Sequence, residues 1–336
     1  SRIFLCPPRE RIAEWAHYAR CASSAYGYYL VLAVAGRGAV SDAPIGDHDA
    51  VIAAHTGTPV EVVYNTCGDG PTAKSRAAPP PLRPSRSSPA FPSSPSSASW
   101  SEGSVMPCCF VAIDRVRRSL IVSIRGTAAL TDIASDLASR AVDASDLFFA
   151  ADVDRENSHE RHRSDARRVV AHEGVLRAAR MLVASRVGDV VEEQLCHLPP
   201  DYKLVLTGHS LGGAVAILAS LLLLKRLERS SQSGDLARAR HFHDHATKPA
   251  GRKVRREMAC YAFGPPPCLA GEYVWPGDSE DARDGNVWQL SSTSFVNRDD
   301  PVPSVCLRSC YELIGDMIAV DRSMQEIAMG RWGRFR

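Results

Sequence analysis

The residues Gly208-His209-Ser210-Leu211-Gly212 place a serine between two glycines. A β-like run at 203–207 precedes this G-x-S-x-G pattern, and an apolar helical run at 213–227 follows it. A serine on such a sharp strand-to-helix turn has a strained backbone, and the flanking glycines let neighbouring chain pass without a Cβ clash. Its hydroxyl lies at the helix N-terminus, where the helix dipole favours negative charge. The pattern therefore predicts that Ser210 is a nucleophile in acyl transfer.

The same five residues also fit an ordinary glycine-rich turn, and the strand before and helix after them are what favour the catalytic interpretation. His209 is not expected to be the base that activates Ser210, because adjacent residues on this turn point in different directions. We expect His209 to pack beneath the turn instead.

Acyl transfer also requires hydrogen-bond donors for the oxyanion. The segment Ile124-Arg125-Gly126-Thr127 ends the β-like run at 120–124, which puts Thr127 at a strand's C-terminal edge beside Ser210. The expected donors are the N–H of Thr127, with its hydroxyl, and the N–H of Leu211. Taken alone, the segment fits a plain strand-ending turn, and Ser210 is what favours the oxyanion role.

A carboxylate is needed to orient the base. Asp299 and Asp300 follow the last β-like run and precede Pro301 and Pro303, which hold the loop rigid. An Asp here also suits a turn. The chain order, with serine before aspartate, favours a catalytic role.

These residues need a scaffold, and helical and β-like patterns alternate over most of the second half of the chain. Alternation of this kind predicts an α/β fold with a mainly parallel sheet covered on both faces by helices. The expected strands are residues 60–64, 109–114, 120–124, 203–207, 258–263 and 294–297. Residues 109–114 and 120–124 are expected to form a hairpin across the basic turn at 115–118.

Two helices are predicted besides the one that follows Ser210. Residues 10–26 carry apolar side chains at helical spacing and are followed by Gly27, which is expected to end the helix. Its core face is expected to contain Ile12, Trp15, Ala16, Ala19 and Ala22. Residues 174–195 keep the same spacing throughout and are expected to form one long helix.

The composition suits one globular domain. The 336 residues are 45% hydrophobic, and 40 Lys and Arg residues nearly balance 38 Asp and Glu residues, for a net charge of +2. This balance gives no reason to expect a nucleic-acid partner. We expect one domain over residues 1–336, with a Pro/Ser-rich disordered insertion at 75–101, a solvated loop at 152–168 and a charged low-order insertion at 228–256.

The cysteines and the apolar runs indicate the cellular compartment of the protein. The ten cysteines show no zinc-type spacing and are expected to be mostly reduced thiols. The apolar runs at 28–35 and 214–224 are shorter than the roughly 20 residues that a membrane-spanning helix needs. With no signal-peptide pattern at the start, we expect the protein in the cytoplasm or at the cytosolic face of a membrane.

The motifs together resemble a known family. Ile-Arg-Gly-Thr at 124–127, Ala-His-Glu-Gly at 171–174, Gly-His-Ser-Leu-Gly-Gly at 208–213 and Asp-Pro-Val-Pro at 300–303 occur in the order seen in class 3 (fungal lipase-type) lipases. The chain is most similar to the catalytic domain of sn-1-specific diacylglycerol lipases, a likeness that runs from about residue 10 to about residue 318.

This resemblance implies an α/β-hydrolase fold in which Ser210 is the nucleophile and Asp300, rather than Asp299, is the acid of the triad. It implies that Thr127 and Leu211 form the oxyanion hole and that residues 128–140 form a lid. No cofactor is implied. Apolar lid residues suit a lipid-facing surface, although a core-packed helix explains their spacing equally well: Ala129, Leu130, Ile133, Ala134 and Leu137.

The expected catalytic histidine is missing from its place in the family pattern, because residues 301–336 contain no His. The chain is expected to end before its histidine; the alternatives are an inactive homologue or an upstream histidine. His172 begins a predicted helix, and His241, His243 and His245 lie in a charged segment where solvated side chains are a better interpretation than a metal site.

The predicted function is hydrolysis of an acyl ester bond of diacylglycerol or a related glycerolipid at a membrane surface. The alternatives are a phospholipase A1 or galactolipase with the same triad, and an inactive lipase-like module that binds lipid or a protein partner. The identity of any protein partner is not predicted.

Overall fold

The computed structural model describes residues 7–27, 31, 47–67, 106–126, 140–148, 168–232, 256–273, 275–276, 288–300 and 302–304. Thr127, the lid up to residue 139, the insertion at 75–101, residues 152–167 and the histidines at 241, 243 and 245 lie outside these ranges.

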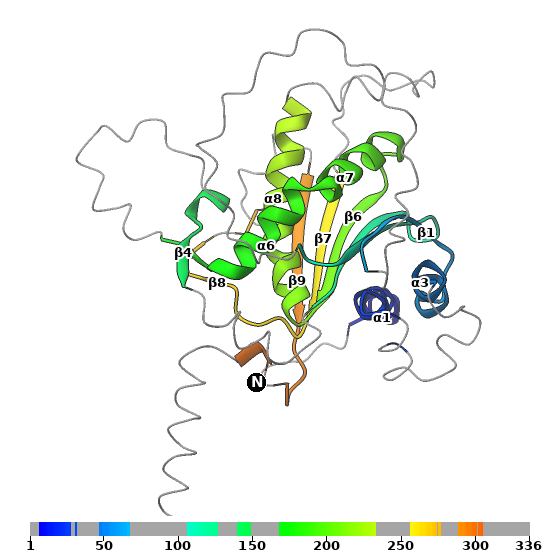
Figure 1. The fold of residues 1–336 in the computed structure, drawn as a ribbon, viewed down its shortest axis with the longest axis horizontal. Helices are drawn as coiled ribbons and strands as arrows, with labels where there is room; N and C mark the ends of the chain where they lie inside the picture. Colours follow the sequence, from blue (N-terminus) through cyan, green and yellow to red (C-terminus); the bar gives the residue numbers. More distant parts are fainter. Residues whose placement is uncertain are drawn as a thin grey trace, which may run out of the picture.

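A six-stranded sheet lies at the centre of the described residues, in the order β1-β2-β3-β6-β7-β9 (Figure 1). The strands are β1 (Val60–Asn65), β2 (Cys109–Asp114), β3 (Ser119–Ile124), β6 (Lys203–His209), β7 (Arg256–Phe263) and β9 (Trp288–Phe295). The pairs β3–β6, β6–β7 and β7–β9 are parallel, and β1–β2 and β2–β3 are antiparallel. The predicted hairpin and the mainly parallel sheet are therefore confirmed.

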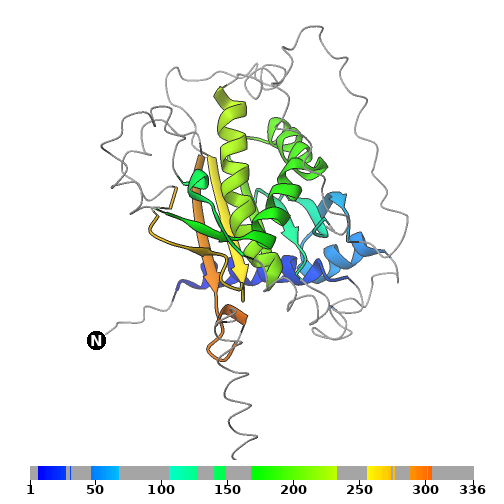
Figure 2. The same ribbon diagram turned by 60° about the vertical axis from the view of Figure 1, so that its left-hand side comes forward.

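Helices cover both faces of this sheet, as Figures 1 and 2 show. One face carries α1 (Arg9–Ser24) and α3 (His48–Thr56), and the other carries α6 (Glu173–Ala184), α7 (Arg186–His197) and α8 (Leu211–Gln232). Strands β2 and β3 are buried along their whole length because both faces are packed. Phe110 and Ala112 point into the core beneath α1, whereas Val111 and Ile113 point into the core on the side of α6, α7 and α8. This arrangement is the α/β-hydrolase fold.

A second, smaller sheet has the order β4-β5-β8 (Figure 1). Its strands are β4 (Ala141–Asp143), β5 (Val170–His172) and β8 (Leu269–Ala270). Two short 3-10 helices, Ser145–Leu147 and Val302–Ser304, complete the regular structure of the described residues.

The first helix packs only partly through the predicted face: Ala22 is buried, and Trp15 and Ala19 are partly buried. Ile12 is 43% exposed and Ala16 is exposed, whereas His17, Tyr18 and Cys21 are buried. The reason is that polar groups dock this helix: His17 Nε2 lies 3.0 Å from Asp114, and the Tyr18 hydroxyl donates to Ser119. Apolar spacing does not reveal such contacts. Gly27 does follow the helix end, with φ of 87°.

The single helix predicted at 174–195 is wrong, because Ser185 divides it into α6 and α7. Ser185 has an extended backbone (φ −83°, ψ −178°), its hydroxyl donates to the Leu182 carbonyl, and its Oγ accepts from the Val187 N–H. Serine competes for backbone hydrogen bonds in this way and so caps helices. The apolar spacing continues across the break, which is why the two helices looked like one.

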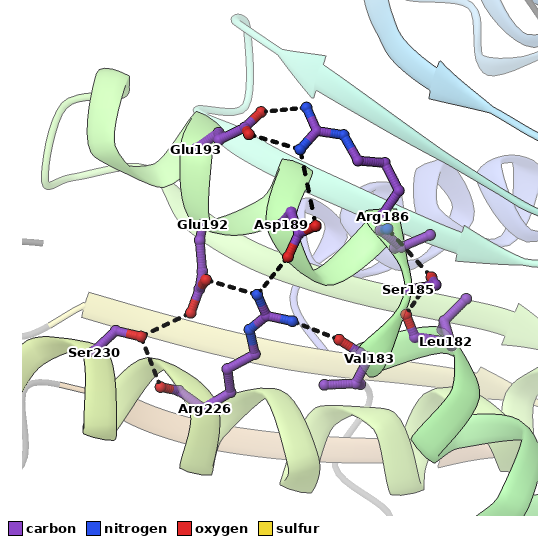
Figure 3. Close-up of polar contacts among 10 residues, drawn as sticks. Leu182, Val183, Ser185, Arg186, Asp189, Glu192, Glu193, Arg226 and Ser230 are labelled. Atoms are coloured by element: carbon purple, nitrogen blue, oxygen red, sulfur yellow. Dashed lines mark hydrogen bonds and ion pairs between the residues drawn. The ribbon is translucent and has the colours of Figure 1, made fainter. Parts of the chain in front are cut away.

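An ionic network ties α7 to α8 beside this break (Figure 3). The Arg226 guanidinium of α8 reaches Asp189 at 2.7 Å and Glu192 at 2.8 Å, both on α7, and donates to the Val183 carbonyl of α6. Ser230 donates to Glu192 from the same face of α8. One arginine thus joins all three helices on this side of the sheet.

Both ends of the charged segment at 228–256 belong to regular elements. Helix α8 continues to Gln232, and Arg256 is the first residue of β7, only 2% exposed. The Arg256 guanidinium donates to the carbonyls of Leu195 and Leu198 at 3.0 and 3.2 Å, at the end of α7. A helix C-terminus attracts a cation. The Arg256 guanidinium, which lies in a segment predicted to be charged and of low order, is therefore buried here. Strand β9 likewise begins at Trp288, six residues before the predicted start.

The buried Asp114 is expected to make the fold acid-sensitive. Burial raises the pKa of its carboxyl, but hydrogen bonds from His17 and the Arg117 backbone, with the charges of both residues, outweigh burial and lower the pKa overall. A carboxyl with a lowered folded-state pKa stabilises the protein fully above its unfolded pKa of about 4, and this stabilisation is lost as the pH falls through the folded-state value.

We therefore expect Asp114→Asn to lower the free energy of unfolding by about 2–4 kcal/mol at pH 7 and by less as the pH approaches 3. Urea denaturation at several pH values measures both quantities. Asp201→Asn is the matched control, because Asp201 pairs with Arg118 at the surface with 45% of its side chain exposed; it should change the stability by less than about 1 kcal/mol. A pH-independent difference between Asp114→Asn and the wild type would contradict this expectation.

The prediction of reduced cysteines agrees with the described residues, where Cys21, Cys67, Cys108, Cys109, Cys260 and Cys268 carry free thiols. Within the same ranges, no helix is both long and apolar enough to cross a bilayer.

Candidate active site

Ser210 stands at the turn between β6 and α8, where the sequence predicts a strained residue. Its φ is +55°, in the left-handed region that non-glycine residues rarely adopt. Three backbone hydrogen bonds hold it there: its N–H donates to the Phe263 carbonyl at 2.8 Å, and its carbonyl accepts from the N–H groups of Gly213 at 2.9 Å and Ala214 at 3.3 Å. The residue is only 8% exposed, so it is more enclosed than the turn alone suggests.

The two glycines that flank Ser210 are required by close backbone contacts. A Cβ on Gly208 would lie 2.8 Å from the Gly213 nitrogen and would collide with the backbone of Gly212. A Cβ on Gly212 would lie 2.8 Å from the Gly126 nitrogen and would collide with the Ile124 carbonyl. Backbone atoms cannot move aside as a flexible side chain can. We call residues 208–212 the elbow.

Of the two expected oxyanion donors, Leu211 lies within the described residues. Leu211 is the first residue of α8, so its N–H has no acceptor within the helix. Thr127 lies outside the described residues, but the chain that leads to it lies against the elbow. Ile124 pairs with Gly208 across the β3–β6 ladder, and a Cβ on Gly126 would lie 2.5 Å from the His209 carbonyl.

Asp300 lies in the loop after β9, next to the same end of the sheet. Its N–H donates to the Asn297 carbonyl and its Oδ1 accepts from the Val302 N–H, both at 3.0 Å. Its Oδ2 lies against Gly264, where a Cβ would come within 2.6 Å. Gly264 directly follows Phe263, the residue that holds the Ser210 N–H. The elbow therefore contacts Phe263 and Asp300 contacts Gly264, so both lie against the turn that follows β7. Asp299 is exposed.

His209 does not pack beneath the elbow as predicted. Its side chain is on the exposed side of the turn, where Nδ1 forms a 3.0 Å hydrogen bond with the Tyr26 hydroxyl. Partial burial lowers the pKa of His209, and the nearby carboxylate of Asp300 opposes this effect without reversing it. The imidazole is therefore mostly neutral at pH 7 and lies near Asp300.

Tyr26 is a residue that the sequence did not single out for the site. It is the last position of the first predicted helix and lies in a segment that resembles the family, but no role in the site was predicted for it. His172 has the structural role expected of it, since its Nδ1 accepts from the Val175 N–H at the start of α6.

A mostly apolar groove of about 580 Å³ is lined by the segment after β7, by β9 and by Ile217 of α8. Pro265, one of its lining residues, lies near the residue that follows the elbow, since a Cβ on Gly213 would contact it at 3.4 Å. The groove runs between α8 and β9 toward a cluster of aromatic rings. Its apolar walls include Ile217, Pro265, Pro266, Leu269, Trp275 and Val296.

Comparison with known proteins identifies the family of the chain. The model of the lipase (class 3) family matches residues 121–309, more than half of the chain, including the end of β3, the elbow and Asp300. Mouse diacylglycerol lipase-beta is 34% identical over 113 residues, which is 33% of this chain and only 14% of that protein.

Solved structures of fungal lipases are also similar. A lipase from Rhizopus microsporus var. chinensis superposes with a TM-score of 0.47 and 17% identity, covering 91% of this chain and 72% of that one. The Lip2 lipase of Yarrowia lipolytica gives a TM-score of 0.46 and 17% identity, covering 89% of this chain and 75% of that one. The fold assignment itself rests on the strand order and the elbow. On the family match, the chain belongs to the class 3 lipases, a family of carboxylic ester hydrolases.

Proposed function

We propose that this protein hydrolyses an acyl ester bond of diacylglycerol or a related glycerolipid, with Ser210 as the nucleophile. The observation that carries the proposal is the elbow: a serine with φ of +55° directly precedes α8, and its neighbours His209 and Gly212 lie against the end of β3. This geometry holds a hydroxyl beside backbone N–H groups that have no partner within the helix. The diacylglycerol preference is supported by the partial match to mouse diacylglycerol lipase-beta.

The reaction proceeds in two steps. Ser210 Oγ attacks the ester carbonyl and gives its proton to a base, while the N–H groups of Leu211 and Thr127 stabilise the oxyanion. The alcohol leaves with that proton, and water then attacks the acyl-enzyme and releases the fatty acid. Within the described ranges, no histidine hydrogen-bonds to the Ser210 hydroxyl, so the proposal assigns the base to a histidine from outside those ranges, oriented by Asp300.

The apolar groove near the elbow supports an acyl-chain substrate. Its proline, leucine, isoleucine and tryptophan walls would bury hydrocarbon, at about 0.8 kcal/mol for each CH₂ group. A membrane surface is the proposed source of the substrate, since diacylglycerol resides there.

The proposal is tested by fatty-acid release from mixed micelles that contain diacylglycerol, phosphatidylcholine or galactolipid, with Ser210→Ala as the blank. We expect diacylglycerol to be cleaved fastest. Faster cleavage of phosphatidylcholine or galactolipid would replace this substrate with a phospholipase A1 or galactolipase activity. Equal rates for the protein and the Ser210→Ala blank on every lipid would favour a lipid- or protein-binding module.

A further inference from the structure

We propose that Tyr26 is a positioning residue for the hydrolytic reaction, because its hydroxyl holds the elbow and the oxyanion segment in place relative to each other. This inference rests on the proposed function. It assigns a role to a residue that precedes the catalytic segments by about a hundred residues or more in the chain.

The Tyr26 hydroxyl contacts the elbow in two places. It forms a hydrogen bond of 3.0 Å with His209 Nδ1, and it lies 3.3 Å from the His209 carbonyl, to which it donates. The two rings meet edge to face, with centroids 5.9 Å apart. Both contacts are with His209, the residue directly before Ser210. They therefore restrain the backbone that positions Ser210.

The same hydroxyl also contacts the segment that leads to Thr127. A Cβ on Gly126 would collide with the Tyr26 oxygen and lie 2.5 Å from the His209 carbonyl, so three groups converge at this point. Burial raises the pKa of Tyr26 to about 12, although a hydrogen bond with the Gly126 backbone and the charge of Arg125 oppose the rise. The hydroxyl therefore keeps its proton at neutral pH and remains a donor.

The turn after α1 fixes Tyr26 itself. Its N–H donates to the Ser23 carbonyl at 3.2 Å, and the following Gly27 has φ of +87°, in the left-handed region. Tyr26 thus contacts both segments of the site. One contact is with His209, which precedes the proposed nucleophile, and the other is with Gly126, which precedes the proposed oxyanion donor. Because transition-state stabilisation requires donors at about 3 Å from the oxyanion, the relative position of these segments sets the rate.

The test compares Tyr26→Phe with Tyr18→Phe. Each substitution removes one hydroxyl and its hydrogen bonds. Tyr26 lies in the turn after α1, whereas Tyr18 lies in the middle of α1 and is bonded to Ser119, away from the elbow. Steady-state hydrolysis of a soluble p-nitrophenyl ester gives kcat and KM, and the rate of fluorophosphonate labelling reports the reactivity of the serine. Thermal unfolding measures the stability of both variants, and NMR titration follows the His209 imidazole.

Removing one oxyanion donor outright lowers kcat by about 10²–10³, and a shifted donor should have a smaller effect. We expect Tyr26→Phe to lower kcat and the labelling rate by about tenfold with KM unchanged, and to shift the His209 titration. Tyr18→Phe should lower stability by a similar amount and leave kcat within twofold of wild type. An unchanged kcat in Tyr26→Phe, or an equal loss in Tyr18→Phe, would overturn the inference.

A second measurement applies if Tyr26→Phe does not fold. Replacing Tyr26 with a ring-fluorinated tyrosine keeps the hydroxyl and its contacts but lowers the pKa of the phenol. The fluorinated protein should then lose kcat at a pH at which the wild type keeps it, because the donor is lost when the phenol ionises; kcat profiles that coincide at every pH would overturn the inference. A wild-type protein that neither hydrolyses esters nor reacts with the fluorophosphonate would instead overturn the proposed function, and this inference with it.

Discussion

Replacing Ser210 with either alanine or glycine is expected to abolish ester hydrolysis. The glycine variant is expected to be the more stable of the two. Loss of a serine nucleophile lowers kcat by a factor on the order of 10⁴ or more. The stability difference has a separate cause. Alanine keeps the Cβ that makes φ of +55° unfavourable, whereas glycine adopts this region freely, which is worth about 1 kcal/mol.

Ester hydrolysis and fluorophosphonate labelling measure the first effect, and urea denaturation measures the second. Ser220→Ala is a matched control, since Ser220 is a fully buried serine of α8 whose hydroxyl donates to the Ile217 carbonyl within the helix. It should retain activity within about twofold. More than 1% residual activity in Ser210→Ala would point to another nucleophile, and equal stability of the alanine and glycine variants would show that the elbow is not strained.

Gly212→Ala is expected to have the second-largest effect. The added Cβ would lie 2.8 Å from both the Arg125 carbonyl carbon and the Gly126 nitrogen, and would collide with the Ile124 carbonyl. All three are backbone atoms at the end of β3, so the strand end must move away from the elbow. We expect a loss of about 2–4 kcal/mol in the free energy of unfolding and a loss of at least about 100-fold in kcat, because the oxyanion segment moves with the strand.

The neighbouring Gly213→Ala separates this contact from a general effect of alanine in the helix. Its Cβ would meet the Gly208 oxygen, Ala262 and Pro265 at 3.1–3.4 Å, which small shifts relieve. Helix propensity favours alanine over glycine by about 1 kcal/mol, so the net change should be within about 1 kcal/mol. Denaturation and labelling of the two variants side by side provide the measurement. Comparable losses in both would mean that the approach of β3 to Gly212 is not the cause.

Local patterns in the amino-acid sequence were sufficient for the scaffold and the elbow. The strand, the glycine-framed serine and the helix around Ser210 are contiguous, so their geometry follows from short-range sterics. The hairpin of β2 and β3 is likewise local, and its buried strands carry uninterrupted apolar runs. The position after the last strand and before two prolines pointed to Asp299 or Asp300, and the family resemblance selected Asp300, which the structure brings to the turn that supports the elbow.

Contacts between distant polar groups were invisible in the sequence. The buried face of α1 was predicted only in part, because His17 and Tyr18 dock through hydrogen bonds that apolar spacing does not reveal. Arg256 suggested solvent, yet it is buried where two helix carbonyls receive its charge. In each case the partner lies on another element, and hydrophobic spacing carries no information about it.

Features that depend on short-range interactions were predicted from the sequence, whereas features that depend on long-range contacts were not. The elbow and the strands that lead to the site depend on neighbours along the chain, so the amino-acid sequence alone predicted them. The contact between Tyr26 and His209 joins residues 183 positions apart. It exists because the sheet brings the end of α1 beside the end of β6, and only the tertiary structure could show that one hydroxyl meets both sides of the site.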